Sequence, residues 1–109
     1  MNITFDAKSL IDLMYIVWNL YYEGNFNDLN DTSRIIQNLF AINNFDKSYP
    51  YDINLLSYFI GYSELMLGNI DESEEIFEEL ISRSNITDDI KEWSSNNLRN
   101  IKYDKEQKK

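Results

Sequence analysis

The chain contains neither cysteine nor histidine in its 109 residues. Without cysteine there are no disulfides and no thiolate metal sites. Without histidine the commonest general base and the commonest transition-metal ligand are both missing. An enzyme would have to use carboxylates, lysine, serine, threonine or tyrosine alone, and nothing resembles a phosphate loop or a nucleophile elbow. We therefore expect a protein that is not an enzyme and that holds no metal and no cofactor.

Proline and glycine are also scarce, with one proline and three glycines. This scarcity favours long helices and argues against a turn-rich β fold. The chain is 43% hydrophobic and 15% aromatic, which is enough apolar material for a core and too much for a disordered chain. Its length favours one domain. We predict a single helical domain over residues 1–103 and a charged, frayed tail over residues 104–109.

Long apolar runs and basic residues are in short supply as well. The apolar run over residues 10–22 is too short to span a membrane and is interrupted by Asp12 and Asn19. The first ten residues lack the basic stretch of a secretory signal, so we expect a cytoplasmic protein. The net charge is −9. Such a surface repels nucleic acids and membranes and favours a basic protein partner; the alternative is that the acidity only maintains solubility.

The centre of the chain is predicted to form two amphipathic helices, at about residues 52–67 and 71–82, that meet at Gly68. Gly68 follows the last apolar residue, as a left-handed helix cap requires. Gly61 lies mid-helix, where glycine costs about 1 kcal/mol against alanine, so we expect a neighbouring helix to approach closely there. Asp52 is a candidate N-cap for the first helix. Asp71, with Glu74 three residues later, predicts a capping box for the second.

An internal repeat extends this pattern towards the N-terminus. The segment GNFND at residues 24–28 resembles GNIDE at residues 68–72, with an offset of 44 residues. We therefore predict a first hairpin, with one helix ending near residue 23 and another running from residue 28 or 31 to 43. A fifth helix, from Thr87 to about Tyr103, is apolar on one stripe only and suits a capping position. The predicted fold is all-α, with about five antiparallel helices arranged as two hairpins and a C-terminal capping helix.

The second hairpin also carries small and aromatic residues at a characteristic spacing. Gly61, Ser73 and Phe77 match the small, small and aromatic positions of the tetratricopeptide repeat. Residues 53–85 resemble this repeat, and residues 10–43 resemble it more loosely. The large aromatic, the tyrosine and the closing proline of the family pattern are absent here. The resemblance implies a helical stack in which the first helix of each pair lines a concave groove.

By this resemblance, the groove would be lined by tyrosines and asparagines, namely Tyr15, Asn19, Asn54, Tyr58 and Tyr62. Tyrosine is common at interfaces because it combines a large apolar ring with a polar tip. The alternative is that these tyrosines are half-buried packing residues. We expect Trp18 and Trp93 to belong to the core rather than to contact a ligand.

Acidic residues gather in the helix after Gly68, and the candidate acidic docking face consists of Asp71, Glu72, Glu74, Glu75, Glu78 and Glu79. Their spacing fits neither a calcium loop nor a carboxylate di-metal site. They form either a solvated helix face or a docking face for a basic partner.

Two functions are therefore predicted. The first is a non-catalytic interaction module, such as an adaptor or a chaperone-like protein, that binds a peptide or helix in the tyrosine-lined groove. The alternative is a small acidic inhibitor of the immunity, antitoxin or phage anti-defence type, which would cover a basic nucleic-acid-binding surface of its target. Because two repeats and a cap bury little apolar surface, either the core closes like a bundle or the chain forms a homodimer.

Overall fold

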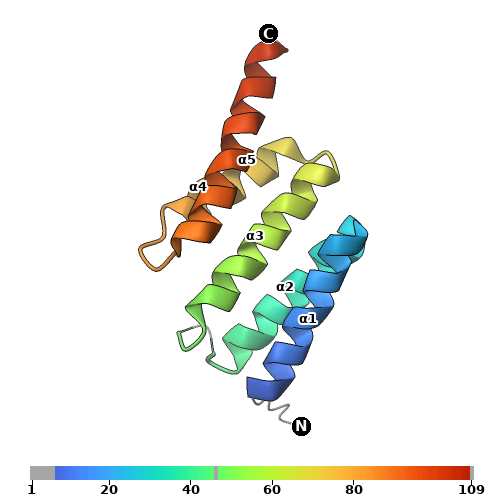
Figure 1. Ribbon diagram of the computed structural model, residues 1–109, viewed down its shortest axis with the longest axis vertical. Coiled ribbons are helices and arrows are strands. Elements are labelled where there is room, and N and C mark those ends of the chain that lie inside the picture. Colours follow the sequence, from blue (N-terminus) through green and yellow to red (C-terminus); the bar gives the residue numbers. More distant parts are fainter. Residues whose placement is uncertain (1–6, 46, 109) are drawn as a thin grey trace.

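The computed structural model describes residues 7–45 and 47–108. These residues form the five helices α1 (Ala7–Glu23), α2 (Phe26–Ile42), α3 (Pro50–Met66), α4 (Ile70–Ile81) and α5 (Asp88–Gln107) (Figure 1). No described residue lies in a strand, so the all-α prediction is confirmed. Among these helices, none is long and apolar enough to cross a membrane.

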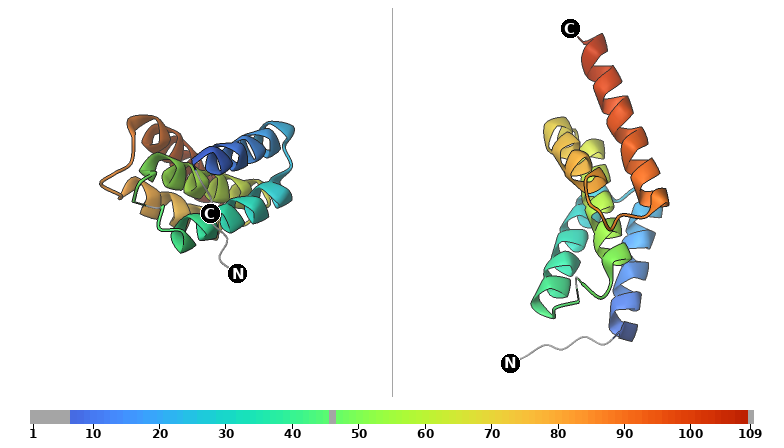
Figure 2. Two further views of the ribbon diagram at one scale, coloured as in Figure 1. Left: turned by 90° about the horizontal axis from the view of Figure 1, so that it is seen from below. Right: turned by 90° about the vertical axis from the view of Figure 1, so that its left-hand side faces the viewer.

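The five helices are arranged around α3, which contacts α2, α4 and α5. Both views in Figure 2 show α1 and α5 on one side of α3 and α2 and α4 on the other. The molecule is elongated, with extents of 53 × 29 × 22 Å, and the C-terminal half of α5 projects beyond the other helices (Figure 1). Helices α1 and α5 therefore both lie on the same side of α3.

The repeated turns predicted from the sequence have the same backbone geometry. Gly24 and Gly68 have φ angles of +71° and +89°. The amide of the following asparagine donates to a carbonyl five residues earlier, at 3.0 Å for Asn25 and 2.9 Å for Asn69. This left-handed cap satisfies the free carbonyls at the ends of α1 and α3. Asn44, at φ 61°, ends α2 in the same way, since asparagine tolerates this conformation better than most residues.

The two helices of the second hairpin approach most closely at Gly61. A Cβ atom at this position would lie 2.9 Å from Cγ2 of Ile76 and 3.0 Å from Cε1 of Phe77. The Ser73 hydroxyl donates to the Gly61 carbonyl at 2.8 Å. The predicted close approach is therefore confirmed, and Phe77 fills the space that the missing side chain leaves.

A buried carboxylate joins α2 to the end of α3. Glu64 is almost fully buried, and Asn30 donates to its Oε1 atom at 2.7 Å. Asn69 donates to its Oε2 atom, also at 2.7 Å, and Arg34 lies 3.3 Å away. Because a buried charge is tolerated only when it is paired and hydrogen-bonded, this network fixes the position of α2 on α3.

The predicted N-terminal caps of the second hairpin are wrong. Helix α3 begins with Pro50 rather than after Asp52, because proline is well suited to the first helical position. Helix α4 begins at Ile70, and its N-cap residue, Asn69, makes no side-chain capping bond. Asp71 lies inside the helix and does not form a capping box with Glu74; Lys105 from α5 binds both carboxylates instead.

The fifth helix has the predicted start and a different end. Thr87 is its N-cap residue, as predicted. Helix α5 continues to Gln107, four residues beyond the end at Tyr103 that the sequence predicts. Contacts between Lys105 and α4 accompany this extension.

Candidate functional site

A cavity of about 340 Å³ opens between α1, α3 and α5. It is lined by six residues, all aromatic: Trp18, Tyr21, Tyr22, Tyr58, Phe59 and Trp93. We call this cavity the aromatic hollow. Its lining comes from α3 and from the two helices, α1 and α5, that lie on the same side of α3 in Figure 2.

The last turns of α1 supply half of the lining. Trp18, Tyr21 and Tyr22 have helical spacings of three and four residues, so their side chains share one side of α1. Gly24 then ends the helix and turns the chain away towards α2. Tyr22 is 75% exposed at the rim, whereas Phe59 is fully buried at the floor.

The rings of the aromatic hollow hold one another in place. The Trp18 ring meets Phe59 edge-on, with 5.0 Å between the ring centroids, and stacks on Tyr22 at 5.7 Å. Tyr58 lies 5.7 Å from Trp93. Such pairs add to the stability that burial provides. The site is therefore largely formed before any ligand binds.

Tyr58 is the one buried hydroxyl of the lining. Asn97 donates a hydrogen bond from Nδ2 to its hydroxyl oxygen at 3.2 Å, and to the Trp93 carbonyl at 2.9 Å. Burial raises the pKa of Tyr58 to about 12. The side chain is therefore neutral at physiological pH and presents no charge to the aromatic hollow.

The structure brings some of the predicted groove residues to this site. Tyr58 lines the aromatic hollow and stacks on Tyr62, with 6.0 Å between the ring centroids. Tyr15, which is 65% exposed, and Asn19, also exposed, lie seven and three residues before Tyr22, so they share the side of α1 that carries Tyr22. They extend the exposed surface of α1 away from the aromatic hollow.

Asn54 is not part of this surface, because its side chain is only 1% exposed. It accepts a hydrogen bond from Nη1 of Arg83 at 3.0 Å and donates to the Asn85 carbonyl at 3.3 Å. Tyr62 is partly buried, and it packs against Tyr21. The prediction that Asn54 lines a groove therefore needs correction: it fixes the end of α4 against α3.

The sequence prediction also missed most of the lining. Trp18 and Trp93 were expected in the core, yet both are partly exposed and line the aromatic hollow. The density of aromatic residues before Gly24 is a signal that could have identified the α1 side. Nothing in the sequence indicates that Trp93 packs against Tyr58, because that contact depends on the angle at which α5 crosses α3.

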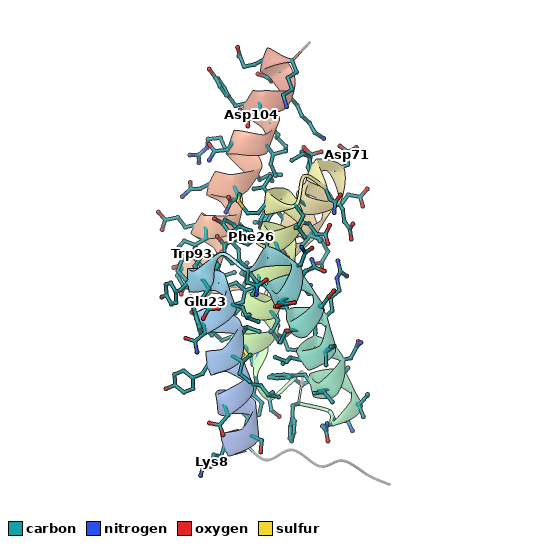
Figure 3. All side chains as sticks on the ribbon, turned by 90° about the vertical axis from the view of Figure 1, so that its right-hand side faces the viewer. Lys8, Glu23, Phe26, Asp71, Trp93 and Asp104 are labelled. Carbon is teal, nitrogen blue, oxygen red and sulfur yellow. The ribbon has the colours of Figure 1, made fainter. Side chains whose placement is uncertain are left out.

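The predicted acidic face is largely neutralised within the molecule. Lys105 binds Asp71 at 2.7 Å and Glu74 at 3.3 Å. The other ion pairs join Glu72 to Arg34, Glu78 to Lys102 and Glu79 to Arg83. Of the six carboxylates, only Glu75 has no basic partner in the described part of the chain. In Figure 3, Asp71 lies towards the side of the molecule opposite Trp93 and Glu23.

A second cavity, of about 280 Å³, lies between α2, α3 and α4. It is lined mainly by charged and polar residues: Arg34, Gln37, Ser57, Ile60, Glu72, Glu75, Ile76, Glu79 and Arg83. Its arginines already bind carboxylates, so they are not free to bind an anion. Within residues 7–45 and 47–108, no cluster of acidic side chains could hold a metal ion.

Comparison of the chain with protein-family models, with curated proteins and with solved structures finds no match. The resemblance to the tetratricopeptide repeat therefore stays a prediction.

Proposed function

We propose that this protein is a non-catalytic interaction module that binds a segment of a protein partner in the aromatic hollow. The observation that carries the proposal is the convergence of six aromatic side chains from three helices on one open cavity. Tryptophan and tyrosine dominate the binding energy of many protein interfaces, because each ring buries a large area with few rotatable bonds. An adaptor or a chaperone-like protein would use such a site.

The size of the aromatic hollow supports a peptide rather than a large rigid surface as its occupant. A volume of about 340 Å³ is at the lower end of ligand cavities and accommodates one large side chain. The exposed residues Tyr15 and Asn19 continue from the cavity along α1 and offer contacts to the residues on either side of that side chain. The tetratricopeptide resemblance supports the same surface, since it assigns the groove to the first helix of each pair.

The experiment is affinity capture of partners from the source cells with tagged wild-type protein and two variants, at low and high salt. Tyr22→Ala removes the exposed ring at the rim. Tyr103→Ala removes a ring of similar exposure, 61%, on the projecting half of α5 and is the matched control. We expect wild-type and Tyr103→Ala to retain the same partner up to high salt, and Tyr22→Ala to lose it.

Equal retention by Tyr22→Ala and the wild type would contradict the proposal. Recovery of only the protein itself, with a dimer in sedimentation, would contradict it unless Tyr22→Ala also abolished the dimer. In that case the partner segment belongs to a second copy of the chain.

A second candidate function is an acidic inhibitor that covers a basic, nucleic-acid-binding surface of its target. The net charge of −9 favours it, and so does Glu75, which has no basic partner among the residues that the structure describes. The five ion pairs of the predicted acidic face weigh against it, because those carboxylates would have to exchange partners. Glu75→Lys should abolish retention of such a target, and high salt should release it.

A further inference from the structure

Among the residues that the structure describes, those that line the aromatic hollow include no basic side chain and present electron-rich ring faces. A cation placed over the face of tryptophan or tyrosine is attracted by the ring quadrupole, most strongly when both are shielded from water. Tyr58 is neutral, and its hydroxyl oxygen already accepts a hydrogen bond from Asn97. The buried part of the aromatic hollow therefore carries no positive charge that would repel a cation. The chemistry of the lining thus suits a positively charged side chain with an apolar stem.

A glutamate adjoins the lining residues in sequence on both α1 and α5. Helix α1 ends at Glu23, directly after Tyr22, so the negative end of its dipole lies beside the aromatic hollow. Figure 3 shows Glu23 on the same side of the molecule as Trp93. On α5, Glu92 directly precedes Trp93. Neither Glu23 nor Glu92 has a basic partner in the described part of the chain. These carboxylates contrast with those of α4, which Arg34, Arg83, Lys102 and Lys105 neutralise.

The basic residue nearest to the site in sequence is Lys91. It lies two positions before Trp93, a rotation of about 200° around α5, so it is directed away from the cavity. Charge complementarity therefore distinguishes the aromatic hollow from the second cavity, whose lining holds both signs of charge.

We propose that the aromatic hollow receives an arginine side chain of the partner segment. This inference rests on the proposed function, and it adds the chemical class of the segment that binds. Arginine fits better than lysine, because its planar guanidinium stacks on aromatic faces and is more weakly hydrated. Glu23 and Glu92 then attract the cation as it approaches, and Trp18, Tyr22 and Trp93 cover its stem.

The test uses a bead-displayed library of random ten-residue peptides, selected with the wild-type protein and counter-selected with Tyr22→Ala. We expect the retained peptides to share an arginine at one position. Each enriched peptide is then remade with citrulline, the uncharged isostere, at that position. Citrulline should weaken binding by roughly two- to thirtyfold, the range of a single cation–π contact. Tyr22→Phe, which keeps the ring, should bind like the wild type.

Binding can be followed without a label, because Trp18 and Trp93 are the two tryptophans of the chain and both line the aromatic hollow. An arginine peptide should change their fluorescence, and its citrulline counterpart should need a higher concentration to do so.

Three results would overturn the inference. Enrichment of apolar or acidic peptides that depend on Tyr22 would contradict the arginine and leave the proposed function standing. Equal binding of the citrulline peptide would do the same. Enrichment of no peptide that distinguishes the wild type from Tyr22→Ala would contradict both the arginine and the aromatic hollow as a docking site.

Discussion

Gly61 shows how one missing side chain determines how two helices pack. Its Cα faces Ile76 and Phe77 of α4 with no room for a Cβ atom. The Ser73 hydroxyl, which donates to the Gly61 carbonyl, requires the same short separation. The loss of helix propensity that glycine causes at this position is therefore offset by the close packing of α3 against α4.

Gly61→Ala should destabilise the protein although alanine favours helices. The strain of a Cβ atom 2.9 Å from Ile76 should cost about 1–3 kcal/mol, and the gain in propensity should offset about 1 kcal/mol. Urea denaturation measures the difference. Gly68→Ala is the control, because its cost of about 1 kcal/mol comes from a φ of +89° and no atom within 4 Å obstructs it. A Gly61→Ala variant more stable than the wild type would contradict the close approach.

Because of Tyr58, the free energy of unfolding should decrease at alkaline pH. Its pKa is raised to about 12 by burial, against 10 in the unfolded chain. Above about pH 10 the unfolded state loses its proton first, so the stability that Tyr58 contributes is lost as the pH rises from about 10 towards 12. By about pH 11 this loss should reach about 1.4 kcal/mol.

Tyr58→Phe should be less sensitive to alkaline pH than the wild type, although it loses the hydrogen bond from Asn97. Urea denaturation at about pH 8 and about pH 11 measures both proteins. Part of the decrease in unfolding free energy seen in the wild type should remain in the variant, because burial also raises the pKa of Tyr21 and Tyr51. The same loss in both proteins would show that Tyr58 ionises as readily in the fold as in the unfolded chain.

At the scale of elements, the sequence predicted the five helices and the C-terminal ends of α1 to α4 well, whereas α5 continues beyond its predicted end. The helix ends at Gly24 and Gly68 could be predicted because a left-handed cap favours glycine. Each glycine ends the helix that directly precedes it, so its effect depends only on nearby residues. The starts of α3 and α4 were predicted less well. Asp71 had a suitable local pattern, but α4 begins one residue earlier, and a lysine 34 positions away binds the Asp71 carboxylate. Local rules do not include such partners.

The interaction of α5 with α4 depends on the same lysine. The Lys105 ammonium donates to Oδ1 of Asp71 at 2.7 Å and to Oε1 of Glu74 at 3.3 Å. Its hydrogen bond and its charge lower the pKa of Asp71 below the usual value.

Lys105→Gln should therefore raise the pKa of Asp71 towards that of a free aspartate, and NMR titration of its carboxyl carbon measures this. The last turn of α5 should also exchange its amide hydrogens faster, because it loses its contact with α4. Lys102→Gln is the control, since Lys102 binds Glu78 and not Asp71. An unchanged pKa of Asp71 in Lys105→Gln would contradict the pairing.

At the scale of the whole molecule, aromatic and charged residues are separated. The aromatic hollow lies on the side of α3 that α1 and α5 flank, and most ion pairs join α4 to α2 or α5. The sequence contained both groups of residues, and it led to a tyrosine groove and an acidic face. It could not show that tryptophans line the cavity or that the acidic face is neutralised, because both depend on how distant helices pack.

The central claim is that a partner docks at the aromatic hollow, and site-specific photo-crosslinking in the source cells tests it most directly. A benzoylphenylalanine replaces Tyr22, Tyr15, Tyr103 or Glu75 in separate experiments. We predict a covalent adduct with one partner from positions 22 and 15 and none from positions 103 and 75. An adduct from position 75 with none from position 22 would contradict the claim and place the partner on the acidic side of the molecule.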